Sequence, residues 1–374
     1  MKTATILLSA ATLCCMSVSA QVSTMEFDVP IHQMRIYDDV LYVSSDHAIS
    51  RYQLSENGGF TPYLDADVVV YDFVMYDGRL LEAGTPEEHF VQHPARPWQL
   101  FQSAPLPQQV MGYQLRKSAN FGGIWWSTGQ ELQVPGRPQF AFNPRNDDEM
   151  LVYGMNEYVD CICPFLLHST DGLATFESVD MAFDREMTAI NQIAFSPTEE
   201  NVLIAATTNG MARSEDGGAT WTFTTPEFQP PFTQLCFDDM HPNVVFATQV
   251  GELPTCICDE VEQVYIVHCS ADGGKTWRAI AAFGTPLTYY QSSKPWHHTG
   301  CLQGLTCHYG NLYGWADEYI FMVQSPLNLS PIINDIKPVV SGSDSTVYSL
   351  QGYKAAQPQT HGIYIRNNKK YAAK

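Results

Sequence analysis

The sequence predicts an all-β fold built from repeated four-stranded units, and three observations support this. Short runs of β-branched and aromatic residues alternate with turn residues along most of the 374 residues, and helical periodicity is nearly absent. One turn pattern recurs, with full copies at residues 214–221 and 270–277. Two apolar strands joined by a turn precede each copy, as at residues 193–206. Four strands in roughly 40–50 residues, repeated, are typical of a β-propeller, for which we expect six blades, with seven as the alternative.

The residues of the recurring turn suit a tight connection between two strands. In the copy at residues 270–277, Asp272 can accept hydrogen bonds from the amides of its own turn, and the two glycines that follow supply positive φ. Trp277 then anchors the next strand. We call the five copies the Asp turns, and their equivalent positions are Asn57, Asn120, Asp171, Asp216 and Asp272. Subtracting these numbers gives spacings of 63, 51, 45 and 56 residues, so we expect the excess to lie in loop insertions.

The start of the chain has the pattern of a secretory signal peptide. Residues 1–20 combine a basic start, an apolar run and a small-residue cleavage site, with cleavage expected after Ala20. Cys14 raises the alternative of a lipoprotein, which the bulky Leu13 before it disfavours. No later stretch has the unbroken apolar length of a transmembrane helix. We therefore expect an exported protein, at the cell surface or outside the cell, with the periplasm as the alternative.

The end of the chain differs in charge from the rest. Residues 341–374 carry five Lys or Arg against one acidic residue, whereas the whole chain has a net charge of −20. Residues 341–345, which are rich in serine and glycine, are typical of a short linker. We therefore divide the mature chain into a propeller at residues 21–340 and a short β tail at residues 341–374.

The overall composition excludes some partners. Nucleic-acid binding needs a basic surface, and a chain with a net charge of −20 does not supply one. The same charge disfavours contact with anionic membranes and favours neutral or cationic partners. Aromatic residues make up 12% of the chain and charged residues only 16%, which suits a β-rich protein with a sizeable core.

Eight cysteines follow the signal peptide, and an exported chain meets an oxidising compartment, so disulfides are the expected state. The candidates are Cys161, Cys163, Cys236, Cys256, Cys258, Cys269, Cys301 and Cys307. Their pairing cannot be deduced from the sequence. A Cys/His metal site is the alternative, but the two Cys-Ile-Cys motifs lack the usual zinc spacing. We therefore expect neither a metal nor a cofactor.

Long loops on one face supply the candidate binding residues. In a propeller, loops that join the second and third strands lie on the face opposite the Asp turns. We place there an insertion at residues 86–110, the two Cys-Ile-Cys loops and residues 294–301. Loops of this kind on a rigid scaffold commonly bind ligands. The candidate residues are Trp98, Tyr158, Trp296, His297 and His298. The alternative is that these side chains pack against their own loops.

The pattern Ser-x-Asp-x-Gly-x-Thr-Trp resembles the Asp-box, or BNR repeat. The resemblance covers residues 30 to about 330 and implies the propeller of sialidases, sortilin-type ectodomains, xyloglucanases and photosystem assembly factors. It also implies that the Asp residues are structural. In the tail, residues 347–352 resemble the Tyr-x-Leu-x-Gly core of the type IX secretion sorting domain, which implies the type IX secretion machinery as a partner. The alternative is a hairpin that closes the fold.

The resemblance to sialidases also frames the question of activity. Sialidases bind a substrate carboxylate with three arginines and use a Tyr–Glu pair, an Asp acid and an Arg-Ile-Pro motif. Met34-Arg35-Ile36-Tyr37 is a partial likeness, with Tyr in place of Pro, and arginine is scarce. We therefore expect a non-catalytic binding module for a glycan or protein ligand. The alternative is a sialidase-type glycoside hydrolase.

Overall fold

The structure is a computed structural model of the chain. It describes residues 22–27, 29–46, 49–54, 61–66, 70–83, 85, 88–105, 113–132, 138–158, 161–185, 188–226, 231–254, 261–285, 303–316, 319–323, 347–349, 354–355, 363–366 and 369–372. The signal-peptide prediction falls on residues 1–20, which lie outside these ranges. Within these ranges, no helix has the length and apolar character needed to cross a membrane.

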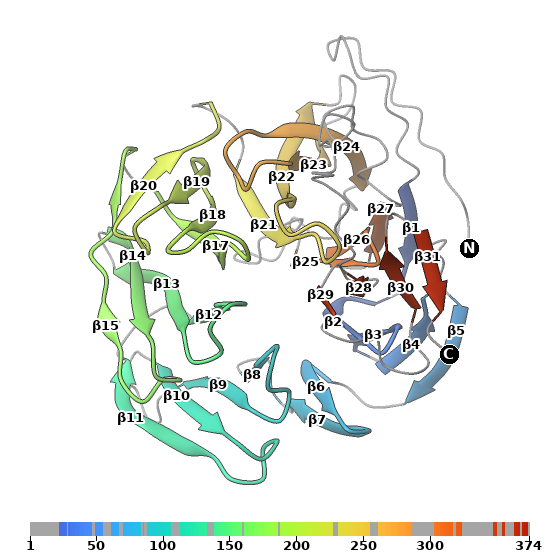
Figure 1. Cartoon of the computed structure of the whole chain (residues 1–374), viewed down its shortest axis with the longest axis horizontal. Helices are drawn as coiled ribbons and strands as arrows, with labels where there is room; N and C mark the ends of the chain where they lie inside the picture. Colours follow the sequence, from blue (N-terminus) through green and yellow to red (C-terminus); the bar gives the residue numbers. More distant parts are fainter. Residues whose placement is uncertain are drawn as a thin grey trace.

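The described strands form sheets that follow one another around a central axis, which confirms the predicted all-β propeller (Figure 1). The first sheet contains β2 (Ile31–Tyr37), β3 (Val40–Ser45), β4 (Ile49–Gln53) and β5 (Thr61–Ala66). A two-stranded sheet follows, made of β6 (Asp72–Tyr76) and β7 (Arg79–Ala83). The next contains β8 (His89–Gln92), β9 (Leu100–Pro105), β10 (Tyr113–Ser118) and β11 (Trp126–Leu132).

The remaining sheets complete the ring. The fourth contains β12 (Gln139–Phe142), β13 (Met150–Tyr158), β14 (Cys161–Ser169) and β15 (Glu177–Ser178). The fifth contains β17 (Ile190–Phe195), β18 (Leu203–Thr207), β19 (Gly210–Ser214) and β20 (Thr220–Phe223), with β16 (Ala182–Phe183) parallel to β20. The sixth contains β21 (Phe232–Phe237), β22 (Val245–Pro254), β23 (Val261–Ser270) and β24 (Arg278–Thr285).

The last sheet joins the two ends of the ring. It contains β25 (Gly304–His308), β26 (Asn311–Ala316) and β27 (Tyr319–Val323), and its fourth strand is the N-terminal β1 (Val22–Glu26). Strand β1 pairs antiparallel with β27, from Val22 beside Val323 to Glu26 beside Tyr319. Strands from both ends of the propeller therefore share one sheet, which closes the ring.

The tail forms a small sheet of its own. Its strands are β28 (Val347–Ser349), β29 (Lys354–Ala355), β30 (Ile363–Arg366) and β31 (Lys369–Ala372), in the spatial order β29-β28-β30-β31. This agrees with the predicted short β tail.

The structure corrects one prediction about the order of strands. Residues 86–110, predicted to be an insertion, contain β8 and β9, which are the first two strands of the third sheet. The segment between them, residues 93–99, therefore joins first and second strands. Such a loop lies on the same face as the Asp turns, which join third and fourth strands.

The core lies between neighbouring sheets, so the middle strands are buried on both faces. All five residues of β18, all five of β19 and all six of β26 are buried. Small residues such as Ala205, Ala206 and Gly314 let the sheets approach, and the ring of Phe321 lies where a Cβ on Gly314 would be. Large side chains such as Trp221 and Tyr265 are also fully buried in this core.

The Asp turns have the geometry that their residues predict. Asp272 Oδ1 accepts hydrogen bonds from the amides of Lys275 and Thr276, at 3.1 and 2.9 Å, and its Oδ2 accepts the Thr276 hydroxyl at 2.7 Å. The Ser270 hydroxyl bonds to Asp272 and accepts the amide of Gly274, which has a φ of 84°. The turns of Asp171 and Asp216 repeat these contacts.

The weaker copies of the turn show how much the pattern tolerates. Leu173 takes the place of the second glycine and still adopts a φ of 65°, a strained conformation for a branched residue. Hydrogen bonds from Thr175 lower the pKa of Asp171 to about 2. Asn120 bonds to the amide of Ile124 at 2.8 Å, whereas Asn57 lies outside the described residues. The Asp turn is therefore a structural connection wherever it is described.

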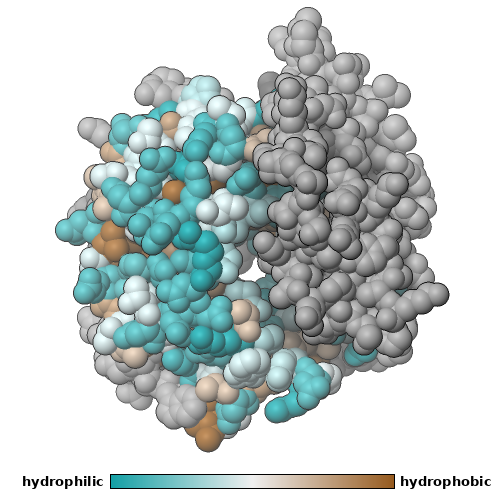
Figure 2. All heavy atoms as spheres, viewed as in Figure 1, coloured by the Kyte–Doolittle hydropathy of each residue, from teal (hydrophilic) through white to brown (hydrophobic). Residues whose placement is uncertain are grey.

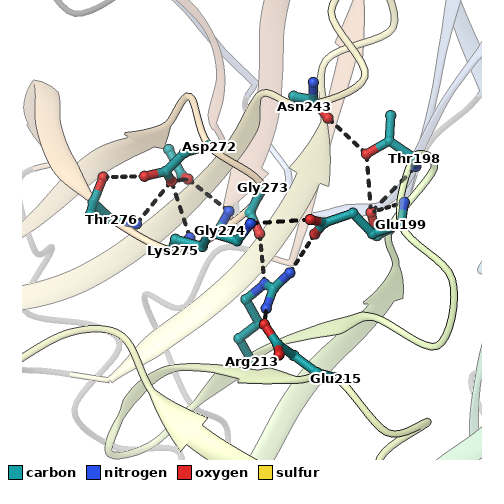
Figure 3. A network of polar contacts seen from close by, with 12 residues as sticks. Thr198, Glu199, Arg213, Glu215, Asn243, Asp272, Gly273, Gly274, Lys275 and Thr276 are labelled. Carbon is teal, nitrogen blue, oxygen red and sulfur yellow. Dashed lines mark hydrogen bonds and ion pairs between the residues drawn. The ribbon is translucent and has the colours of Figure 1, made fainter.

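One Asp turn also links two sheets through charged side chains (Figure 3). Arg213 of β19, only 6% exposed, donates from Nε to the carbonyl of Gly273 in the neighbouring Asp turn. Its guanidinium also contacts Glu199 and Glu215, and Lys275 reaches Glu199 at 3.1 Å. The turn thereby fixes the position of the next sheet around the ring.

Candidate functional site: a central pocket lined by amides

First strands of most of the sheets line a pocket of about 560 Å³ at the centre of the ring. Its walls come from β2, β6, β8, β17, β21, β25 and β26. Figure 2 shows hydrophilic side chains bordering an opening at this place. A pocket of this size is in the range that holds small ligands.

Glutamine is the recurrent residue of the pocket wall. The five glutamines are Gln33, Gln92, Gln192, Gln234 and Gln303. Three of them occupy equivalent places in three first strands, within the pattern apolar-x-Gln-apolar. The segments are Ile31-His32-Gln33-Met34, Ile190-Asn191-Gln192-Ile193 and Phe232-Thr233-Gln234-Leu235.

A β-bulge explains why these glutamines share a position. The strand register shifts between Ile31 and Gln33 in β2, and equivalent shifts precede Gln192 in β17 and Gln234 in β21. The extra residue lets the two flanking apolar residues, three apart, both enter the same core cluster, as Ile31 and Met34 do. The glutamine between them is left at the pocket wall.

Hydrogen bonds to the backbone hold part of this wall in place. Gln192 Oε1 accepts the amide of Leu235 at 2.7 Å, and its neighbour Asn191 donates to the carbonyl of Phe232 at 2.6 Å. Both contacts join β17 to β21. The amide nitrogen of Gln192 and the whole side-chain amide of Gln234 make no hydrogen bond within the described residues. These groups are therefore available to a ligand.

Gln92 is held more tightly than the other amides. Its Nε2 donates to the carbonyls of Met75 and Pro97, both at 2.8 Å, and its Oε1 accepts the hydroxyl of Tyr37 at 3.0 Å. Trp315 also lines the wall, and its ring occupies the space that a Cβ on Gly304 would need. The indole nitrogen of Trp315 is buried without an acceptor within the described residues.

Arg35 is the one permanently charged side chain among the described residues of the wall, and it is paired. Its guanidinium donates to Asp72 Oδ1 at 3.1 Å and to the carbonyl of Phe90 at 2.9 Å. Asp72 is 1% exposed, and its Oδ2 accepts a hydrogen bond from the amide of Phe90 at 2.9 Å. The same oxygen lies 2.8 Å from Nδ1 of His89. Burial alone would raise the pKa of Asp72, but Arg35 and His89 outweigh it and hold the pKa well below its usual range.

The balance of charges limits the chemistry of the pocket. None of the described residues of its wall is a carboxylic acid. His93 also lines it, and burial lowers the pKa of that ring, which favours the neutral form. Hydrolysis of a glycoside commonly requires two carboxyl groups beside the bond, and Asp72 is enclosed behind Arg35. The wall offers hydrogen-bond donors and acceptors with little net charge.

The residues predicted from the loops do not gather at this pocket. Trp98 is 43% exposed, but its carbonyl accepts the amide of Phe121 in the turn of Asn120, which places it on the face of the Asp turns. This corrects the predicted location of Trp98. Tyr158 is the last residue of β13. The other three candidates, Trp296, His297 and His298, lie outside the described residues.

The cysteines do not form the predicted disulfides where the structure describes their side chains. Cys236, Cys269 and Cys307 have free thiols, so the expectation of pairing is wrong for these three in this structure. The first Cys-Ile-Cys motif, predicted to be a loop, begins β14, where Cys161 pairs with Tyr158 of β13. Cys163 lies in the same strand. Cys256, Cys258 and Cys301 lie outside the described residues.

One group of described residues has the side chains needed to hold a metal ion, although no metal site was expected. Asp238, Asp239 and Cys307 each place one ligand atom within 4.8 Å of the others. The group lies at the ends of β21 and β25, on the face of the Asp turns, and is separate from the pocket.

Comparisons with known proteins give the following. No protein-family model and no curated protein matches the sequence. Among solved structures, the phage phi92 endosialidase has a TM-score of 0.47 at 10% identity, and the match covers 94% of this chain and 74% of the endosialidase chain. "YCF48 bound to D1 peptide" has a TM-score of 0.39 at 11% identity, covering 84% and 99%. An ancestral GH74 enzyme has a TM-score of 0.41 at 14% identity, covering 68% of this chain.

The chain spans only 31% of the length of that GH74 enzyme. At TM-scores below 0.5, these likenesses carry no argument about function. The strand topology itself establishes the propeller fold.

Proposed function

We propose that the chain is an exported, non-catalytic binding protein whose central pocket holds a neutral glycan. The observation that carries this proposal is the composition of the pocket wall, with five glutamine amides, one paired arginine and, within the described residues, no carboxylic acid. A side-chain amide both donates and accepts hydrogen bonds. That combination matches the hydroxyl groups of a neutral sugar and gives no advantage to a charged ligand.

Burial and rigidity support the same proposal. Gln192 and Gln92 are fixed by backbone hydrogen bonds, so a ligand would not have to order them. Tyr37 and Trp315 add apolar surface beside the amides, as sugar-binding sites commonly require. A protein ligand remains the second candidate, because an extended peptide backbone also offers paired donors and acceptors.

The sialidase-type hydrolase is the catalytic alternative. Its three-arginine clamp would need free guanidinium groups, whereas Arg35 is bonded to Asp72 and to the carbonyl of Phe90. A carboxylate of the substrate would have to displace Asp72, which is almost completely buried. This arrangement favours binding without turnover.

A glycan array run beside a sialidase assay tests the proposal. The wild type should bind neutral oligosaccharides and release no sialic acid. Gln234→Leu removes an amide without breaking a described hydrogen bond, so it should weaken binding roughly tenfold with little change in stability. Gln53→Leu changes an exposed glutamine outside the pocket and serves as the control for binding, although it also removes a hydrogen bond from the Gln53 amide to the carbonyl of Asp39. Turnover that Arg35→Ala abolishes would refute the non-catalytic proposal, and capture of peptides alone would refute the glycan ligand.

Export is proposed on the two ends of the chain. Residues 1–20 would direct export, and residues 341–374 would engage the type IX secretion machinery. Deleting residues 341–374 should then leave the protein in the periplasm of its own host. Unchanged secretion of the shortened chain, measured by immunoblotting of the medium and the cell surface, would refute that role of the tail.

A further inference from the structure

Two acidic residues and a cysteine meet where two sheets of the ring touch. The first strands β21 and β25 lie against each other, although they belong to neighbouring sheets. Asp238 and Asp239 follow β21 directly, and Cys307 is the second-last residue of β25. One ligand atom of each lies within 4.8 Å of the other two.

One oxygen of this group is buried without a partner. Asp238 is 3% exposed, and its Oδ1 accepts the amides of Met240 and His241 at 2.7 and 3.0 Å. The ring of His241, 53% exposed, also contacts Oδ1, at 3.4 Å. Asp238 Oδ2 is buried and has no hydrogen-bond partner within the described residues. A carboxylate oxygen removed from water in this way is unfavourable unless something binds it.

The other two side chains are held beside that oxygen. Asp239 accepts the amide of Tyr309 at Oδ2, at 2.7 Å, and the amide of Gly310 at Oδ1, at 3.1 Å. These two bonds fix its carboxylate against the turn between β25 and β26 and leave further lone pairs free. Cys307 packs against the same core cluster as Cys236 and Cys269. The ligands are thus positioned by the fold of two sheets.

The mixture of donor atoms indicates which ion would fit. One sulfur and two carboxylate oxygens suit Zn²⁺, which takes thiolate and carboxylate ligands in a four-coordinate site. Calcium and magnesium prefer oxygen ligands alone. Asp239 is exposed, so water can reach the fourth position.

We propose that Asp238, Asp239 and Cys307 bind one Zn²⁺ between these two sheets. Binding would replace the proton of the Cys307 thiol, which is released to solvent, and would give Asp238 Oδ2 its missing partner. The ion would join the sheet of β21 to the sheet that β1 closes. It would therefore stabilise the closure of the ring by mass action.

Metal content and a spectroscopic probe test this on the full-length mature protein without a tag. After incubation with zinc chloride and desalting, elemental analysis should find one zinc per chain. Cobalt chloride added to the metal-free protein should produce the near-ultraviolet band of a thiolate bound to cobalt. This wild-type measurement does not depend on any variant, and absence of the band would overturn the proposal.

Variants then locate the ion. Cys307→Ser and Asp238→Asn should each weaken zinc binding by roughly tenfold or by a larger factor. Cys269→Ser is the matched control, because Cys269 is a buried thiol of the same core cluster outside the group. It should keep the zinc and the rise in melting temperature that zinc causes. Zinc bound by Cys307→Ser as tightly as by the wild type, or a disulfide between Cys236 and Cys307 in the protein as purified, would overturn the proposal.

Discussion

Replacing Asp72 by Asn should destabilise the protein strongly, because the change removes the charge that pairs with Arg35. Asp72 joins β6 to both of its neighbours, since Arg35 comes from β2 and Phe90 from β8. Removing one partner of a buried ion pair costs about 3–5 kcal/mol. Arg35 is 23% exposed, so water screens part of its charge, and we expect the low end, about 3 kcal/mol.

A double-mutant cycle measured by urea unfolding tests this. Arg35→Met leaves Asp72 with its backbone donors and His89, so it should cost less than Asp72→Asn. The double variant should cost less than the sum of the two single variants by at least about 1 kcal/mol. Asp46→Asn is the matched control, because Asp46 is 48% exposed and pairs with His32 at the surface. This substitution should change the free energy of unfolding by less than about 1 kcal/mol. Additive costs within about 0.5 kcal/mol would refute the reasoning.

The same pair predicts a dependence on pH. The fold holds the pKa of Asp72 below its usual range, so the unfolded chain binds more protons and the stabilisation exists above the unfolded pKa. It is lost as the pH falls below about 4. The difference in unfolding free energy between the wild type and Asp72→Asn should therefore shrink by roughly 1 kcal/mol at about pH 3. A difference that stays constant would contradict the assignment.

Three further predictions concern other parts of the ring. Burial lowers the pKa of His268 to about 4, so between pH 6.5 and about 4 the unfolded chain binds a proton at this residue that the folded chain does not. The melting temperature of the wild type should therefore decrease as the pH is lowered through this range, and that of His268→Gln should decrease less. Gly304→Ala would place a Cβ 1.8 Å from the ring of Trp315, so urea unfolding should show a loss of about 1–3 kcal/mol, and an unchanged stability would refute this packing. Asp272→Ala removes the acceptor of two amides and of the Thr276 hydroxyl, so it should cost about 1–2 kcal/mol, and Asp272→Asn should cost less.

The fold was predictable because its signals are local. Each Asp turn needs only residues within one short segment, and Asp171, Asp216 and Asp272 form the contacts that their neighbours suggest. The propeller then follows from their repetition. The misassigned segment at residues 86–110 had weak local signals, because proline punctuates it and β8 has only four residues. The segment forms strands because β8 pairs with β9 and β9 pairs with β10, and the sequence of the segment alone does not indicate the partner β10.

The pocket was harder to predict because its residues are scattered. The sequence indicates Arg35 only through a partial likeness to a sialidase motif, and its partner Asp72 lies 37 residues further along the chain. The glutamines did leave a signal in the pattern apolar-x-Gln-apolar. Its two apolar residues are three apart, which does not fit the alternation of a strand, and the β-bulge reconciles them. Aligning the first strands of the units would have exposed this pattern.

The ion pair with Asp72 explains why a charged residue, Arg35, can line a pocket whose other polar groups are mostly amides. A free guanidinium in this wall would select anionic ligands. Its pairing with Asp72 cancels most of that charge while other N–H groups of the guanidinium remain. A paired arginine therefore offers directional donors much as an amide does. Asp72→Asn should therefore shift the ligand preference of the pocket toward anionic sugars, measured under conditions where the variant stays folded.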